Sequence, residues 1–71
     1  MTSAQCRAAR AMLHWSVRDL AKAAGIHFTT VTNFETGRSS ASLESIDAMQ
    51  AALEKAGVEF TYGKRSGVRP R

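Results

Sequence analysis

Three glycines, at positions 25, 37 and 57, each follow a segment in which apolar residues recur at helical spacing. A glycine in this place is typical of a helix end, because it adopts the left-handed conformation without a steric penalty. The helices on either side of Gly25 are therefore short, and only "AAGIH" joins them. This spacing is typical of a helix-turn-helix, although an ordinary all-helical bundle has the same periodicity.

Polar residues mark where the first helices begin. Thr2 with Gln5, and Ser16 with Asp19, each have the spacing of a capping box, in which two side chains satisfy free backbone N–H groups. We therefore expect one helix over about 3–13 and a second of two turns that ends at Gly25. A third helix should begin near His27 or Phe28.

The second half of the chain predicts one longer helix and a strand. Ser42 is placed to cap the fourth helix, whose expected apolar stripe is Leu43, Ile46, Met49, Leu53 and Ala56. In "VEFTY" the period changes to two, which indicates a short strand. The predicted fold is an all-α, four-helix domain over 1–57, followed by a C-terminal strand and a mobile basic tail over 58–71.

We expect the strand to mediate dimerisation, because a lone strand leaves backbone groups unpaired and a second copy is the simplest partner. The residues on its contact face are Val58, Phe60 and Tyr62. A hairpin that folds back through Val68 and Arg69 is the competing interpretation, and both arrangements can coexist.

The charge of this 71-residue chain is uneven. The net charge is +4 with a pI near 10.0, but residues 1–42 carry five basic and two acidic side chains, whereas residues 43–62 carry one and four. All the charged side chains of the last nine residues are basic. One half therefore suits a polyanion or an acidic surface, and the other does not.

Other features of the sequence argue against several classes of site and of protein. Cys6 is the only cysteine, so no intramolecular disulfide can form, and we expect a small core residue in a reducing compartment. His14 and His27 have no metal-site spacing, and no catalytic constellation or cofactor loop stands out. We expect a cytoplasmic, nucleoid-associated protein that is not an enzyme, holds no metal or cofactor and has no membrane span.

The segments "WSVRDLAKAAGI" and "TVTNFETGR", with Arg10 near the end of the first helix, carry a family resemblance. They resemble the lambda-repressor and Cro-like helix-turn-helix proteins (the xenobiotic-response-element type), over residues 4 to about 56. The ending is similar to a short bacterial subgroup in which a strand replaces the fifth helix. The resemblance implies a transcriptional regulator, a repressor or autoregulator, that binds a palindromic operator in double-stranded DNA as a homodimer.

The resemblance also implies roles for individual residues. Base contacts would come from Phe28, Thr29, Thr32 and Asn33. Phosphate contacts would come from Arg18, Thr36, Arg38 and Ser39. Helical geometry agrees in part, because Thr29, Thr32, Asn33 and Thr36 fall opposite the expected buried residues Val31 and Phe34.

Arg10 lies on an apolar stripe, where an unpaired charge is costly, and the family pairs such an arginine with the residue that is Glu35 here. The sequence departs from the family pattern at Val17, where a glutamine is usual, at His27 and Phe28, where a small polar cap followed by glutamine or serine is common, and at His14, where glycine is frequent. Phe28 could touch a base or could shield the Arg10–Glu35 pair from water. The alternative function is a protein-binding antiactivator or antitoxin that uses the same surface.

Overall fold

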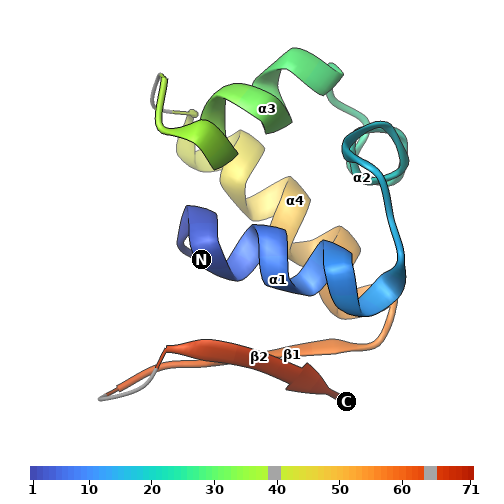
Figure 1. The fold of residues 1–71 in the computed structure, drawn as a ribbon. Helices are drawn as coiled ribbons and strands as arrows, with labels where there is room; N and C mark the ends of the chain where they lie inside the picture. Colours follow the sequence, from blue (N-terminus) through green and yellow to red (C-terminus); the bar gives the residue numbers. More distant parts are fainter. Residues whose placement is uncertain (39–40, 64–65) are drawn as a thin grey trace.

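The computed structural model describes residues 1–38, 41–63 and 66–71. The elements are α1 (Ser3–Leu13), α2 (Val17–Ala24), α3 (Phe28–Thr36), α4 (Leu43–Lys55), β1 (Val58–Thr61) and β2 (Gly67–Pro70). In Figure 1, α3 lies at one end of the molecule and the strands lie at the other, with α1 and α4 between them. The predicted four-helix class with a C-terminal strand is confirmed. Within the described residues, no helix has the length and apolar character needed to cross a membrane.

Both predicted capping boxes are present. The Thr2 hydroxyl accepts the Gln5 N–H at 3.1 Å, and the Gln5 Oε1 accepts the Thr2 N–H at 2.8 Å. Ser16 and Asp19 make the same reciprocal pair, at 3.0 and 2.8 Å. These bonds satisfy donors that a helix start leaves without partners, and they explain why α1 and α2 begin where the sequence predicts.

Left-handed residues end the first three helices. Gly25 (φ 71°) follows α2 and Gly37 (φ 73°) follows α3, as expected from the sequence. His14 ends α1 in the same conformation, with φ 56°, although it carries a side chain. Such a conformation is uncommon for a residue with a Cβ atom.

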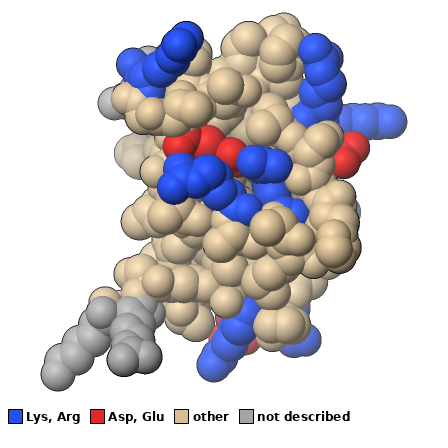
Figure 2. Space-filling model, viewed as in Figure 1, with Lys and Arg blue, Asp and Glu red and all other residues tan. Residues whose placement is uncertain are grey.

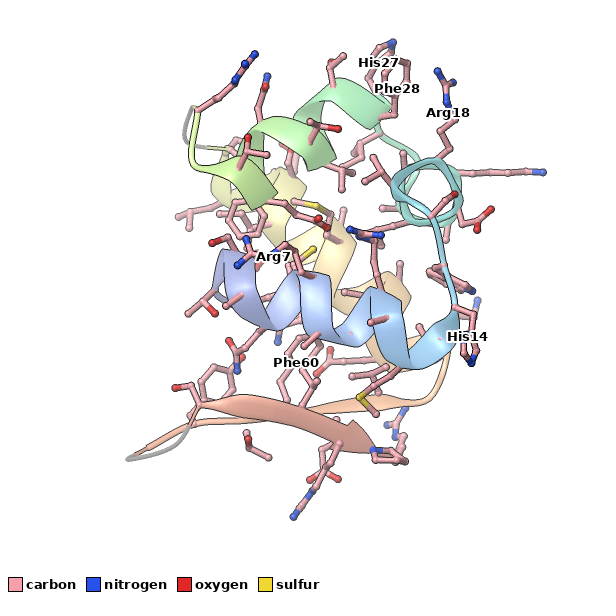
Figure 3. All side chains as sticks on the ribbon, viewed as in Figure 1. Arg7, His14, Arg18, His27, Phe28 and Phe60 are labelled. Atoms are coloured by element: carbon pink, nitrogen blue, oxygen red, sulfur yellow. The ribbon has the colours of Figure 1, made fainter. Side chains whose placement is uncertain are left out.

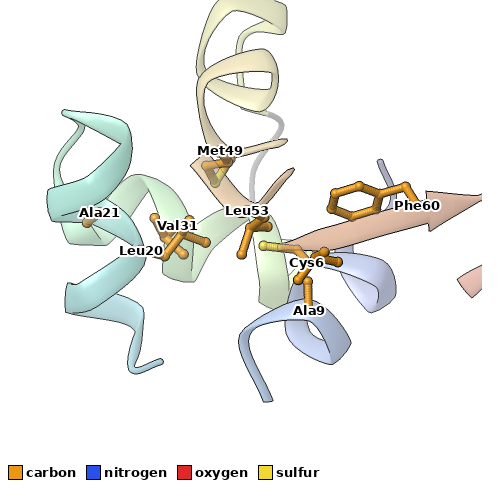
Figure 4. Close-up of a cluster of buried hydrophobic side chains, with 9 residues drawn as sticks. Cys6, Ala9, Leu20, Ala21, Val31, Met49, Leu53 and Phe60 are labelled. Atoms are coloured by element: carbon orange, nitrogen blue, oxygen red, sulfur yellow. The ribbon is translucent and has the colours of Figure 1, made fainter. Parts of the chain in front are cut away.

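One core joins all the helices to the first strand (Figure 4). Its buried apolar residues are Cys6, Ala9, Leu20, Ala21, Val31, Met49, Leu53, Val58 and Phe60. Because β1 contributes two of these side chains, residues on both sides of the expected boundary at 57/58 pack into the same core.

The predicted apolar stripe of α4 is wrong at both ends. Leu43 is 79% exposed, and Ala56 is also exposed. Leu43 is the first residue of α4, and helical side chains point towards the N-terminus, so this one extends past the core. The buried part of the stripe consists of Met49 and Leu53, with Ile46 half-buried beside them.

The expectation of a lone strand is also wrong. β1 pairs with β2 in an antiparallel hairpin whose register runs from Val58 opposite Pro70 to Thr61 opposite Gly67. The fold-back that competed with the lone strand therefore forms, and residues 67–70 of the tail expected to be mobile are a strand. Tyr62 lies beyond the end of β1 and is 60% exposed. Lys64 and Arg65 of the basic tail lie outside the described residues.

Gln5 attaches the hairpin to α1. Its Nε2 donates to the carbonyl oxygens of Thr61 at 2.9 Å and Gly67 at 3.0 Å, while its Oε1 completes the capping box. The side chain is 2% exposed and uses both amide protons and the amide oxygen. A glutamate would satisfy the capping box equally well, but its carboxylate has no proton to give to these carbonyls.

We predict that Gln5→Glu lowers the free energy of unfolding by about 2–3 kcal/mol, because it leaves two carbonyls without their donor and faces them with a buried charge. Urea unfolding followed by circular dichroism measures this value. Gln50→Glu makes the same chemical change on α4 and should have little effect. Equal stabilities of the two variants would contradict the proposed attachment.

Candidate nucleic-acid interface

A tight turn fixes α3 against α2. The N–H of Ile26 donates to the Ala21 carbonyl at 3.0 Å, and the N–H of Gly25 donates to the Lys22 carbonyl at 3.3 Å. These two bonds satisfy carbonyls at the end of α2 in the pattern of a glycine-terminated helix. His27 then caps α3, because its Nδ1 accepts the N–H of Thr29 at 3.2 Å. The relative position of the two helices is therefore set within a few residues.

The two sides of α3 differ in burial as the sequence predicts. Val31 is buried and Phe34 is half-buried against the core. On the opposite side, the exposed residues are Thr29, Thr32 and Thr36, and Asn33 is half-buried. The structure therefore brings these four polar residues together on one side of α3.

Some polar groups on this surface already have a hydrogen-bond partner within the protein, and others do not. The Thr36 hydroxyl donates to the Thr32 carbonyl at 2.8 Å, and the Thr29 hydroxyl lies 2.8 Å from His27 Nδ1. Within the described part of the chain, the Thr32 hydroxyl and the Asn33 amide make no hydrogen bond. These two side chains can therefore bond to an external partner without breaking an internal contact.

Basic side chains stand at both ends of α3. Arg38 comes after Gly37 at the end of α3 and is exposed, and Arg18 of α2 lies beside Phe28 at the other end. Figure 2 shows blue side chains at the two upper corners of the molecule, with a surface of uncharged residues between them. Ser39, the remaining expected phosphate contact, lies outside the described residues.

Phe28 is half-buried, and its ring contacts two neighbours (Figure 3). The Arg18 Cζ lies 4.0 Å from the ring centroid, and the His27 ring stacks on Phe28 with centroids 4.6 Å apart and an interplanar angle of 29°. No sequence pattern predicts the contact of Arg18 with Phe28, because the two residues lie on different helices and no periodicity relates them.

The ion pair expected between Arg10 and Glu35 is present. Arg10 donates from Nε to Oε2 and from Nη2 to Oε1 of Glu35, both at 2.7 Å. The Glu35 side chain is only 4% exposed and that of Arg10 is 19% exposed. Paired, hydrogen-bonded charges of this kind can be buried, whereas either charge alone would be costly. This hydrogen bonding also raises the pKa of Arg10.

Three further groups complete the surroundings of this pair. The Cys6 Sγ donates to Glu35 Oε2 at 3.2 Å, Arg7 donates to the Glu35 backbone carbonyl, and Arg10 Nη1 donates to the Trp15 carbonyl at 3.0 Å. Burial, followed by the bond to Glu35, raises the pKa of the Cys6 thiol to about 12. The thiol is therefore a protonated core group, in agreement with its predicted packing role.

Other kinds of site find little support in the described residues. No cluster of three or more histidine, cysteine, aspartate or glutamate side chains is placed to hold a metal ion there. Trp15, Asp19, Lys22 and Ala23 line an open hollow on the outer side of α2. The polar side of α3 is the surface with converging hydrogen-bonding groups.

A protein-family model described as helix-turn-helix matches residues 7–60, which is well over half of the chain. The match includes the whole of α2, the turn and α3. The chain matches none of the curated proteins with which it was compared.

The buried ion pair leads to a stability prediction. Glu35→Gln should lower the free energy of unfolding by about 3 kcal/mol, because the partly buried Arg10 charge loses its compensation. Glu59→Gln is the matched control, since Glu59 pairs with Arg69 at the same 2.7 Å on the exposed surface of the hairpin. We expect little change from the control, because solvent screens an exposed pair. Urea denaturation that gives equal losses for both variants would refute this role of burial.

Proposed function

The chain belongs to the lambda-repressor and Cro-like helix-turn-helix family of DNA-binding regulators, and we propose that it is a repressor that inserts α3 into the major groove of its operator. The observation that carries this proposal is the polar side of α3, where the Thr32 hydroxyl and the Asn33 amide are both without an internal partner among the described residues. Arg10 and Glu35 hold the other side of the same helix against α1.

The exposed side chains of α3 suit the edges of bases. We propose that Phe28, Thr29, Thr32 and Asn33 contact bases. An asparagine amide can make two hydrogen bonds to adenine, and a threonine offers both a hydroxyl group and a methyl group that fits against thymine. When the Thr29 hydroxyl donates a hydrogen bond to His27 Nδ1, its oxygen can still accept one from a base.

Groups at the end of α3 would lie near the DNA backbone. We propose that Thr36 and Arg38 contact phosphates, with Ser39 as a third contact. Arg38 is exposed on the turn that follows Gly37, and a mobile cation in such a place positions a protein on DNA without reading its sequence.

We predict that Arg38→Ala weakens binding to specific and nonspecific DNA by a similar factor and reduces the slope of log affinity against log salt by about one. Lys55→Ala removes the same charge at the end of α4 remote from α3 and should leave this slope unchanged. Fluorescence anisotropy at several salt concentrations measures both variants. If the wild type itself binds no DNA but captures a regulator protein, the antiactivator alternative applies.

We also propose that the protein binds a palindromic operator as a dimer, in which β1 of one copy pairs with β1 of the other. In an antiparallel ladder, hydrogen-bonded residue pairs alternate with pairs that share no hydrogen bond. The N–H of Arg71 donates to the Gly57 carbonyl at 2.8 Å, so the next pair, Val58 and Pro70, shares no hydrogen bond. The backbone groups of Val58 and Phe60 therefore point to the open edge of β1, although their side chains are buried in the core of one copy. On β2, Pro70 removes a donor from the outer edge.

This pairing is consistent with the arrangement needed on DNA. Two antiparallel copies of β1 are related by a two-fold axis perpendicular to the sheet. Because α3 lies on one side of the sheet (Figure 1), both copies of α3 would be on the same side of the dimer. Successive turns of the major groove require these helices to be about 34 Å apart.

We predict that Tyr62→Lys weakens dimerisation, because Tyr62 is 60% exposed directly after β1 and two copies would meet there. Leu43→Lys is a matched control, since Leu43 is also an exposed large apolar residue but lies at the start of α4. Sedimentation equilibrium should give a weaker dimer for the first variant and an unchanged one for the second. A wild-type protein that stays monomeric at tens of micromolar would refute the dimer.

A further inference from the structure

Arg18 is held at the leading end of α3 by an aromatic ring. It belongs to the first turn of α2, but its Cζ lies 4.0 Å from the centroid of the Phe28 ring, in the first turn of α3. His27 stacks on the same ring. A guanidinium over an aromatic face is attracted by the ring electrons, and this contact limits where the side chain can go.

The hydrogen-bonding groups of Arg18 remain available in this arrangement. Within the described residues Arg18 makes no hydrogen bond or ion pair, and its side chain is exposed. The neighbouring carboxylate of Asp19 accepts the Ser16 N–H as part of the capping box. The guanidinium therefore presents N–H donors in a planar fork, a geometry that matches acceptors in pairs.

We infer that Arg18 reads a guanine in the operator half-site, and that Phe28 is a positioning residue for it. This inference rests on the proposed function, because it requires α3 to enter the major groove. It assigns Arg18 to a base, in place of the phosphate contact that the resemblance implies. The ligand is a G·C base pair in the major groove of that half-site.

Two considerations favour a base over a phosphate. In a helix-turn-helix the N-terminal residues of the second helix contact base edges, and the Arg18 side chain reaches from α2 to the first of those residues. The guanidinium of Arg18 also has no hydrogen bond within the described residues, and its planar fork fits the O6 and N7 atoms of guanine.

The test begins with selection of binding sites from random duplexes by the wild-type protein, Arg18→Lys and Arg18→Ala. In Arg18→Ala we expect one guanine per half-site to lose its preference, with the other positions unchanged, and in Arg18→Lys the same preference should weaken, because lysine lacks the planar fork. Replacing that G·C pair by A·T should weaken wild-type binding by roughly 10- to 100-fold, and should hardly affect Arg18→Ala. Arg18→Lys keeps the charge, so a weaker preference in this variant would separate base reading from simple attraction to DNA.

Phe28→Tyr and Phe28→Leu test the positioning role. The tyrosine keeps an aromatic ring and should retain the guanine preference, whereas the leucine keeps an apolar side chain and should weaken that preference as Arg18→Lys does. Thermal melts show whether each variant is folded, and the Arg18 variants remain informative if Phe28→Leu is not. A leucine variant that keeps the preference would overturn the positioning role.

Two other outcomes are distinguishable. If Arg18→Ala weakens all duplexes equally, lowers the salt slope by about one and leaves base preferences unchanged, Arg18 is a phosphate contact and the inference is wrong. If the wild-type protein shows no sequence-selective binding, the proposed function itself fails. In that case no variant of Arg18 or Phe28 would be expected to alter a base preference.

Discussion

The position of α3 depends on the hydrogen bonds that the buried carboxylate of Glu35 accepts. It accepts two bonds from Arg10 on α1 and one from the Cys6 thiol, and Arg10 also reaches the Trp15 carbonyl between α1 and α2. One charged group thus joins the helix proposed to enter DNA to the helix that supports it. Since a buried charge is tolerated only when its partners are in place, the pair favours a single arrangement of these elements over similar ones.

The two ends of the molecule are specialised in different ways. At one end, α3 presents short polar side chains, with Arg18 and Arg38 on either side of them. At the other end, the hairpin completes the core through Val58 and Phe60 and is tied to α1 by Gln5. Because these contacts are made within one copy, the side chains of β1 are not free to fill a partner's core. Any pairing of two copies at β1 would have to use backbone groups and the residues at the end of the strand.

Much of the fold could be predicted because its signals are local. Thr2, Ser16 and Gly25 act on backbone groups within four residues, so their roles can be read from sequence spacing. The predictions from the sequence were wrong where contacts between distant residues determine the structure. Whether β1 is single or paired depends on residues 67–70, and the exposure of Leu43 depends on where the core ends. For the site, helical periodicity found the polar side of α3, and the resemblance supplied the partner of Arg10. The contact of Arg18 with Phe28 and the two bonds from Gln5 to the hairpin have no local signal.

The attachment of Gln5 to the hairpin also affects how the protein is made. Its two acceptors, the carbonyls of Thr61 and Gly67, lie 56 and 62 positions further along the chain. During translation, α1 is therefore synthesised long before the groups that complete its packing. The polar amide of Gln5 cannot bond to both of its acceptors until residue 67 has left the ribosome. Contacts between distant positions slow folding, and exposed apolar surface favours aggregation in the meantime. Completion of this small domain therefore depends on the synthesis of the hairpin that follows α4.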